Sequence, residues 1–304
     1  MVADADFWLT QFLNGMQLSM LLFLLSIGLT IIFGLMHFVN LAHGALYMVG
    51  AYVGVSAAAS LGNFWLALIA APLAVTLVGI VLYVAVIRRM RRAGPMNQVL
   101  VTFGLIFVLV DLVRILWGDI ALGMEQPAIL SGPAEIFGVT YPAYRLFIIA
   151  VGLVVLVALS LVLSRTQIGA MVRAGVENDA MASCLGINVE RLFFAVFCVG
   201  CALAGLAGAV AAPVFSATPS MATDILIPTL IVVVIGGLGS LGGAIVGSLI
   251  IGFIQTFGAV VLPGFASVLV YVLLAIVLIA KPAGLLPAQE LVHVLSDALS
   301  SRSR

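Results

Sequence analysis

Few side chains in this 304-residue sequence could perform covalent or redox chemistry. Its single lysine, Lys281, follows Ala280, so the Gly-Lys-Ser/Thr loop that binds nucleotide phosphates is missing from the sequence. The three cysteines, Cys184, Cys198 and Cys201, have the spacing of neither a disulfide framework nor a metal site. No apolar run contains a paired histidine and carboxylate cluster or a serine–histidine constellation of the kind that catalysis uses. An enzyme is therefore the least favoured class, and any ATP hydrolysis must occur on another polypeptide.

Charged residues inside apolar runs are equally scarce. Only Asp111 and Arg114 lie clearly within such a run, and their spacing of three residues places them on one face of a helix. We expect the two side chains to neutralise each other near the external end of that helix. A proton-coupled carrier would need an unpaired carboxylate along its route, and the sequence offers no good candidate. An ion-coupled carrier or a channel is thus disfavoured but stays an alternative.

Two short stretches combine polar residues with helix-breaking glycine. They contain Asn40, His43 and Gly44 in the first, and Gly236, Gly237, Gly239 and Ser240 in the second. Interrupted helices often mark the place where a membrane transporter exposes backbone groups to its cargo. Helix ends could bind a carboxylate and an ammonium there through backbone dipoles, without any fixed charge. We predict that these residues line a translocation pathway.

Other glycines and histidines in these regions have simpler roles. The pairs Gly243 with Gly247 and Ala204 with Gly208 have the small-xxx-small spacing of close helix packing. His37 and His43 are expected to form hydrogen bonds at helix ends rather than to act as bases.

The elements that position these residues must lie in lipid. Hydrophobic residues make up 64% of the chain and charged residues 8%, and the mean hydropathy is +1.33. Such a chain has too little polar surface to cover a water-soluble globule. Backbone groups in lipid must be paired within their own segment, which favours α-helices, and the alternation typical of a membrane β-barrel is missing. We expect an all-α, polytopic membrane helix bundle that forms a single transmembrane domain over residues 1–304.

Apolar runs about 20 residues long, the length that crosses a bilayer as a helix, recur along most of the chain. The predicted spans are 15–36, 41–61, 64–87, 97–117, 143–164, 192–212, 225–239, 241–262 and 265–280. The run 225–239 is the doubtful one, because it is short, carries Pro228 and ends near Gly236-Gly237. It could enter the membrane without crossing it. The number of membrane segments is therefore about eight or nine, including a possible re-entrant or broken helix.

Basic residues predict the orientation of the bundle, because cytoplasmic loops retain arginine and lysine. They form two clusters, Arg88, Arg89, Arg91 and Arg92 in one loop and Arg165, Arg173 and Arg191 in another. The segment 118–142 is acidic and has no basic residue, so we expect it outside the cell. Residues 1–13 also lack basic residues, which argues against a signal peptide and for an external N-terminus. Lys281, Arg302 and Arg304 favour a cytoplasmic C-terminus, which requires 225–239 and 241–262 together to return the chain to the outside.

The longest internal loop predicted to be cytoplasmic, residues 165–191, is unlike a linker. Asn178 or Asp179 can cap a short helix that Gly186 would end. That helix would present Met181, Cys184 and Leu185 on one side, a small apolar face that fits either a groove on a partner or the membrane surface.

This loop resembles the cytoplasmic loop of ABC importer permeases, in which a Glu-Ala-Ala stretch, three further residues and a Gly enter a cleft of the ATPase. Ala182 and Gly186 stand at that spacing, whereas Ala180 and Met181 replace the Glu and the first Ala, and Asp179 stands one place early. The match is therefore to a loose version of the motif. The resemblance implies a docking site made of Arg173, Glu177, Asp179, Ala180, Ala182, Leu185, Gly186 and Ile187.

A wider resemblance extends from about residue 14 to Pro287. Its motifs are Phe33-Gly-Leu-Met-His-Phe-Val-Asn-Leu-Ala-His-Gly-Ala-Leu-Tyr-Met-Val-Gly50, Arg173-Ala174 with Leu185-Gly-Ile187, Ala204-Gly-Leu-Ala-Gly208, and Gly236-Gly-Leu-Gly-Ser-Leu-Gly-Gly243. Together they are similar to the LivH-type permeases of branched-chain amino acid ABC importers. The resemblance implies a bacterial inner-membrane protein that binds no cofactor itself and works with two ATPase subunits, a LivM-type permease and a periplasmic binding protein. Cargo is expected to be a branched-chain or similar hydrophobic amino acid, with urea, short amides or aromatic acids as alternatives.

Overall fold

The computed structural model describes residues 5–91, 93–136 and 138–286. Arg92, Arg302 and Arg304, which contribute to the predicted orientation, lie outside these residues. The long helices are α1 (Ala5–Met36), α2 (His43–Leu61), α3 (Phe64–Leu82), α5 (Pro95–Trp117), α6 (Ala143–Arg165), α9 (Val189–Phe215), α12 (Leu241–Val261) and α13 (Ala266–Ala280). The short elements are the π-helix η1 (Tyr83–Ile87), α4 (Arg88–Met90), the 3-10 helix η2 (Ala128–Leu130), β1 (Pro133–Ile136), β2 (Val139–Pro142), α7 (Gln167–Glu177), α8 (Asp179–Cys184), α10 (Met221–Asp224) and α11 (Leu226–Gly236).

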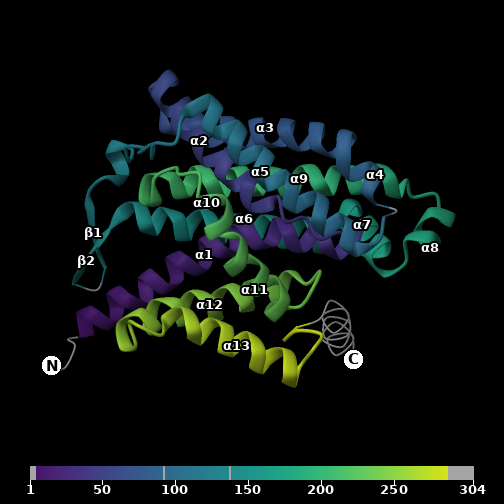
Figure 1. Ribbon diagram of the computed structural model, residues 1–304. Helices are drawn as coiled ribbons and strands as arrows, with labels where there is room; N and C mark the ends of the chain where they lie inside the picture. The colour runs from purple at the N-terminus through teal and green to yellow at the C-terminus, as the bar shows by residue number, and fades with distance from the viewer. Residues whose placement is uncertain (1–4, 92, 137, 287–304) are drawn as a thin grey trace.

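Most helices run between two ends of the molecule (Figure 1). One end carries the β1–β2 hairpin and is called the hairpin end, and the other carries α7 and α8 and is called the loop end. Helix α1 lies between α9 and α12 and packs against both. Among the described residues, seven helical stretches are long and apolar enough to cross a membrane, whereas Met221–Gly236 and Val268–Ala280 are shorter. The predicted all-α membrane bundle is therefore confirmed.

Glycines allow the backbones in the centre of the bundle to meet. A Cβ atom added to Gly50 of α2 would lie 2.6 Å from the Cα of Gly205 of α9, and one added to Gly208 would meet the Ala51 nitrogen at 2.7 Å. Gly79 of α3 similarly leaves room for Cys201, which is fully buried. Small residues at such crossings allow the close helix approach that stabilises membrane bundles. Packing was the role predicted for Cys201 and Gly208, and it is confirmed.

The segment predicted as 225–239 crosses the bundle in two short helices. Ala217, before α10, pairs with Leu122 at the hairpin end through hydrogen bonds of 2.8 and 2.9 Å. Gly239, after α11, contacts Gly34 near the loop end of α1. Helix α12 then runs back beside α1, with Gly252 against Ser19. The chain therefore returns to the hairpin end along α12, as the charge pattern required, and the segment before α12 runs toward the loop end as two short helices.

A different segment re-enters the bundle. Helix α1 ends at Met36 near the loop end, and residues 37–42 lead back to His43, whose imidazole bonds the Leu25 carbonyl in the middle of α1. Leu25 and Met36 are separated along the helix by about 16 Å, a distance that six extended residues can span. The predicted start of the second span at residue 41 is thus close to the observed start.

The β1–β2 hairpin was not predicted. Its two four-residue strands pair antiparallel, with Glu135 opposite Thr140. Tyr141 ties the hairpin to α1, because its hydroxyl donates to Asn14 Oδ1 at 3.0 Å, and Arg145 donates to the same oxygen at 2.6 Å. Burial raises the pKa of the Tyr141 phenol, so the hydroxyl keeps its proton at neutral pH.

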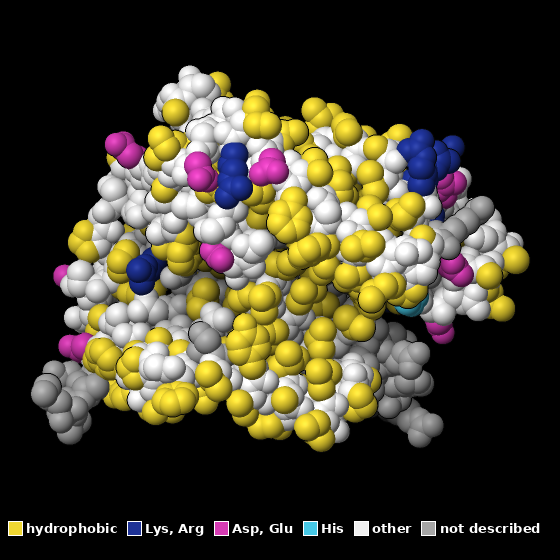
Figure 2. Space-filling view, in the orientation of Figure 1, with side chains coloured by type: hydrophobic (Ala, Val, Ile, Leu, Met, Phe, Trp, Pro, Cys, Tyr) yellow, Lys and Arg dark blue, Asp and Glu magenta, His cyan; other side chains and the backbone are white. Residues whose placement is uncertain are grey.

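Charges lie mainly toward the two ends of the visible face, and hydrophobic side chains cover its middle (Figure 2). The predicted Asp111–Arg114 pair exists, with Nη1 and Oδ1 3.4 Å apart, and Arg114 also binds Asp119 at 3.1 Å. Arg114 therefore bridges two carboxylates at the hairpin end of α5.

Candidate functional site

The first candidate site lies where residues 37–42 meet α2. His43 is 1% exposed, and its Nε2 lies 3.1 Å from the carbonyl oxygen of Leu25. Gly28 of α1 makes room for the ring, since a Cβ atom there would lie 3.0 Å from His43 Nε2. His37, by contrast, is exposed at the end of α1, where its backbone N–H donates to the Phe33 carbonyl. The predicted role of His43 as a hydrogen-bonding residue at a helix end is confirmed.

Asn40 is the polar side chain with the least support. It is 1% exposed, and neither its amide oxygen nor its amide nitrogen has a partner among the described residues. Leaving a buried polar group unpaired costs about 1–3 kcal/mol, so such groups usually have a structural or functional reason. Here the amide offers both a donor and an acceptor to a polar molecule.

The N-terminus of α2 adds a second set of unpaired groups beside Asn40. The Ala42 N-cap has no side chain that could accept a hydrogen bond from the helix. No described residue accepts from the backbone N–H of Gly44 or Ala45, while the N–H of His43 reaches the Asn40 carbonyl at 3.3 Å. The first N–H groups of a helix carry partial positive charge, and buried ones attract an anion such as a carboxylate.

Helix α10 and the start of α11 close this site. A Cβ atom on Gly44 would collide with the Ala222 carbonyl oxygen and would lie 3.4 Å from Leu226 Cβ. Ala222, Gly44 and Asn40 are all buried. A molecule could therefore reach the first turn of α2 at Gly44 only if α10 and the start of α11 moved away from it.

The second predicted stretch, Gly236 to Ser240, has a visible packing role. Gly237 and Gly239 have φ values of 107° and 80°, a region that favours glycine, and Gly239 lies against Gly34. Ser240 Oγ accepts from the Gly243 N–H at 3.0 Å and caps α12. Gly247 packs against the Val232 carbonyl, as the small-xxx-small spacing of α12 predicted.

The residues after α13 also hold this turn. The N–H groups of Leu285 and Leu286 donate to the carbonyls of Ile235 and Gly236 at 2.8 and 3.1 Å, so they cap the end of α11. Among the described residues, no hydrogen bond or glycine contact joins the two predicted stretches. They touch different turns of α1, His43 at Gly28 and Gly239 at Gly34.

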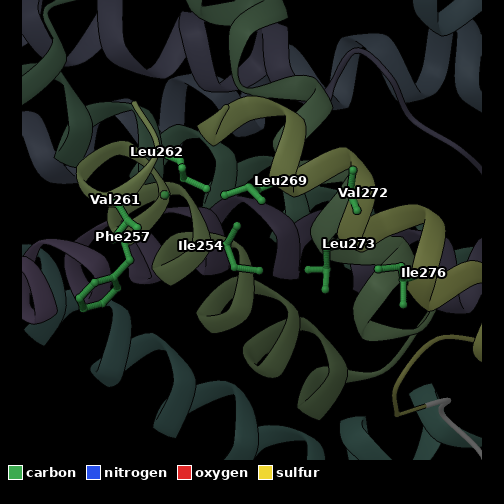
Figure 3. A pocket seen from close by; sticks show the side chains of 9 residues that line it. Ile254, Phe257, Val261, Leu262, Leu269, Val272, Leu273 and Ile276 are labelled. Carbon is green, nitrogen blue, oxygen red and sulfur yellow. The ribbon is translucent and has the colours of Figure 1, made fainter. Parts of the chain in front are cut away.

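An apolar groove between α12 and α13 does not suit a polar cargo. It has a volume of about 420 Å³, lies between α12 and α13, and opens on the surface. Its walls are apolar side chains, labelled in Figure 3, together with Gly258. A charged carboxylate or ammonium would find no hydrogen-bond partner there, which makes such a location costly.

The second candidate site is the segment 165–191, which we call the docking segment. Its short helix α8 forms as predicted, because Asn178 Oδ1 accepts from the Met181 N–H at 2.9 Å. It ends as predicted as well, with Gly186 at φ 86° and the Ile187 N–H donating back to the Ala182 carbonyl at 3.1 Å. These bonds form a helix-ending motif that requires a left-handed residue at Gly186.

The predicted docking residues divide into an exposed set and a buried set. Exposed are Arg173, Glu177, Asp179, Ala180, Leu185 and Gly186, whereas Ile187 is half-buried. Leu185 is 76% exposed and the neighbouring Met181 64%, so α8 does present an apolar outer face. Ala182 is 2% exposed and packs inward with Leu35 and Val172, so it supports the helix rather than forming its outer face.

The docking segment rests on the same helix that carries the first site. Gly175 of α7 faces Leu35 of α1, and a Cβ atom on Gly175 would lie 2.9 Å from Leu35 Cδ1. Leu35, Val172 and Leu192 belong to one buried cluster. Sequence reasoning missed Leu35 and also missed Gly28 and Gly34. Glycines inside an otherwise unbroken apolar helix were the available signal for the last two.

These features define a polytopic helical membrane protein, as expected of the membrane subunit of a transporter. Helix α1 leads into the break before α2 and also packs against the segment that contains the capped helix α8. Residues 11–280 match the family described as branched-chain amino acid transport system / permease component. The chain belongs to this family, and it is a transporter membrane subunit rather than a catalytic enzyme.

Several characterised relatives cover nearly the whole chain. It is 28% identical to the high-affinity branched-chain amino acid transport system permease protein LivH of Escherichia coli K12, over 95% of this chain and 98% of the relative. The LivH protein of Salmonella typhimurium LT2 is 27% identical over the same shares, and BraD of Pseudomonas aeruginosa is 28% identical over 94% of this chain and 98% of its own. No solved structure matches the chain.

Proposed function

We propose that this chain is the permease subunit of an ATP-driven importer that moves branched-chain or similar hydrophobic amino acids into the cytoplasm. The relatives are named as permeases of branched-chain amino acid transport, and they align with the chain over almost its full length. The proposal includes a place for the cargo, a contact for the ATPase and a path between the two.

The cargo site in this proposal is the interruption before α2. The unpaired N–H groups of Gly44 and Ala45 would bind the carboxylate, and Asn40 Oδ1 would accept from the ammonium. A neutral pair of contacts suits a zwitterion, because no charged residue is among the buried residues of the described chain. The aliphatic side chain would lie against the apolar surfaces of α10 and α11, which must move to admit it. Gly236, Gly237, Gly239 and Ser240 would form the turn on which α11 moves.

The energy in this proposal comes from partner subunits that bind the docking segment. The exposed apolar face of Met181 and Leu185 would enter a groove on one of two ABC ATPases. Basic residues gather at the loop end, which supports a cytoplasmic location for that end. A second permease of the LivM type, a periplasmic binding protein and the bacterial inner membrane complete the proposed assembly.

One observation carries the proposal: α1 packs against the docking segment and also leads into the break before α2. The Leu35–Gly175 contact joins α7 to the last turns of α1. Gly34, the residue before Leu35, touches the turn between α11 and α12. Movement of the docking segment would therefore act on both sides of the closed site. To accept cargo, α10 would move away from α2 so that the site opens toward the hairpin end. To deliver cargo, the site would open toward the loop end.

Reconstitution tests this function directly. The full chain and its co-purifying subunits would be placed in proteoliposomes with the binding protein and labelled leucine, with and without ATP. Uptake is expected only with ATP and the ATPases. Uptake by the chain alone would identify a carrier or channel, and ATP-dependent uptake of urea, acetamide or phenylacetate but not leucine would reject the cargo.

A further inference from the structure

A groove at the loop end includes residues from the end of the docking segment but lies apart from the apolar face of α8 that the transport proposal uses. It lies between the π-helix η1 and the start of α9, with a volume of about 290 Å³, and it opens on the surface. Its walls are formed by Tyr83, Val84, Arg88, Asn188, Glu190, Arg191 and Phe194. The dark-blue cluster at the loop end in Figure 2 belongs to the same region of basic side chains.

The π-helix gives the groove its shape. In a π-helix the chain is wider than in an α-helix, and such turns are frequent at functional sites. Arg89 supports this widened turn, because its Nη1 donates to the carbonyls of Val84 and Ala85. Phe194 lies against the Tyr83 ring, with centroids 5.2 Å apart, and forms the floor.

Positive charge exceeds negative charge around the groove. Arg88 and Arg191 line it, and Arg91 lies next to it over the Phe193 ring at 3.9 Å. Glu190 is the one acid in the lining and binds Arg88 with a Nε–Oε1 distance of 2.7 Å. The N-terminus of the 27-residue helix α9 begins here as well, and its dipole favours an anion.

The buried hydroxyl of Tyr83 also belongs to this groove. Tyr83 is 3% exposed and lines the groove, and its hydroxyl forms no hydrogen bond of normal geometry with a described residue. The Arg91 side chain lies close to the Tyr83 hydroxyl. A buried hydroxyl beside guanidinium groups suits a phosphate oxygen.

A continuous apolar stripe leads away from the groove along α3. Ile69, Leu73, Leu77 and Val81 are 60%, 66%, 64% and 61% exposed, and their spacing of four residues places them on one face of the helix. Val84, which is 55% exposed, joins this stripe to the groove. The surface therefore offers cationic contacts at one end and a long hydrocarbon contact below it.

We propose that this groove binds the phosphate headgroup of an anionic phospholipid, whose acyl chains lie along the α3 stripe. Arg191 and the Tyr83 hydroxyl bind the phosphate, Arg88 is shared between the phosphate and Glu190, and the apolar stripe distinguishes a lipid from a free anion. Basic pockets between transmembrane helices recognise lipid headgroups in this way.

Native mass spectrometry of the full-length chain, with phosphatidylglycerol or phosphatidylcholine added in detergent, tests the site. The wild type is expected to retain phosphatidylglycerol preferentially. Arg191→Gln should lower its affinity about fivefold, the change that corresponds to about 1 kcal/mol for one basic residue near an anionic headgroup. Glu190→Gln should raise the affinity, because it removes the acid and releases Arg88. Arg165→Gln, a basic residue at the loop end that does not line the groove, is the matched control and should change nothing.

Several results would overturn the assignment. Equal retention by the wild type, Arg191→Gln and Glu190→Gln would remove the groove as a lipid site. Displacement of phosphatidylglycerol by an equal concentration of inorganic phosphate would identify a site for a free anion instead. Loss of a co-purifying protein from Arg191→Gln, with lipid retention unchanged, would make the groove a protein contact. Circular dichroism and gel filtration of each variant confirm that it has folded.

Discussion

Gly34 of α1 and Gly239 of the α11–α12 turn touch each other through their backbones. A Cβ atom on Gly34 would lie 2.6 Å from the Cα of Gly239, whose φ of 80° already restricts that position to residues that tolerate the left-handed region. The neighbouring Leu35 packs against Gly175 of the docking segment. One turn of α1 thus contacts α7 of the docking segment, which is expected to transmit movement, and the α11–α12 turn, which is expected to receive it.

Gly34→Ala should therefore destabilise the chain, because backbone atoms on the opposite side cannot rotate away. We expect a loss of about 1–3 kcal/mol, as for other insertions into a packed interior. Thermal unfolding of the purified protein in detergent measures the effect. Gly104→Ala on α5, where a Cβ would meet nothing within 4 Å, is the matched control and should be neutral or slightly stabilising. Equal melting temperatures for the two variants would contradict the close contact.

Asn40→Ala should separate stability from transport. The side chain has no described partner, so its removal should leave the free energy of unfolding unchanged or raise it by about 1 kcal/mol. Uptake of leucine in proteoliposomes should fall at least tenfold if the amide binds cargo. Ser248→Ala is a control, because the Ser248 hydroxyl is buried and bonds only the Ile245 carbonyl of its own helix. Normal uptake by Asn40→Ala would remove Asn40 from the pathway.

Much of the membrane bundle could be predicted from hydropathy, because a long apolar run in lipid has few alternatives to a helix. The cap at Asn178 and the end at Gly186 were predictable for a similar reason, since both depend on local backbone chemistry. Partners across the bundle were not predictable. Gly236 and Gly239 indicated a break, but the sequence does not tell that their contacts are Gly243 and Gly34.

The candidate site shows the same division. The polar and glycine-rich stretch around His43 indicated a break in helical structure, and the structure has one at residues 37–42, between α1 and α2. Its closure by Ala222 depends on α10, a four-residue helix with no pattern of its own. The β1–β2 hairpin was missed because each strand has only four residues and gains its position from Asn14 on a distant helix.

Leu185→Asp should prevent ATPase binding without unfolding the chain. The side chain is 76% exposed, so a carboxylate there remains solvated, whereas in a docking groove it would be buried without a partner. Co-purification of the tagged chain with its ATPase subunits measures the contact and should fall to background. Ile129→Asp, equally exposed at 82% but at the hairpin end, is the matched control and should keep the ATPase bound. Full co-purification of Leu185→Asp would move the contact away from α8.

Leu35→Ala should weaken the link between ATP hydrolysis and transport while the ATPase stays bound. It removes the side chain against which Gly175 packs, so movement of α7 would no longer be passed to α1. The measurement is the number of leucine molecules imported per ATP hydrolysed, which should drop severalfold. Leu24→Ala is a matched control, because Leu24 is equally buried on the same helix but belongs to the core cluster that does not include the docking segment. Both substitutions should cost about 2–5 kcal/mol through the cavity they leave, so stability alone cannot separate them. A lowered ratio in Leu35→Ala together with a normal ratio in Leu24→Ala would locate the coupling at the end of α1. Equal ratios in the two variants would show that the movement reaches the break before α2 by another route.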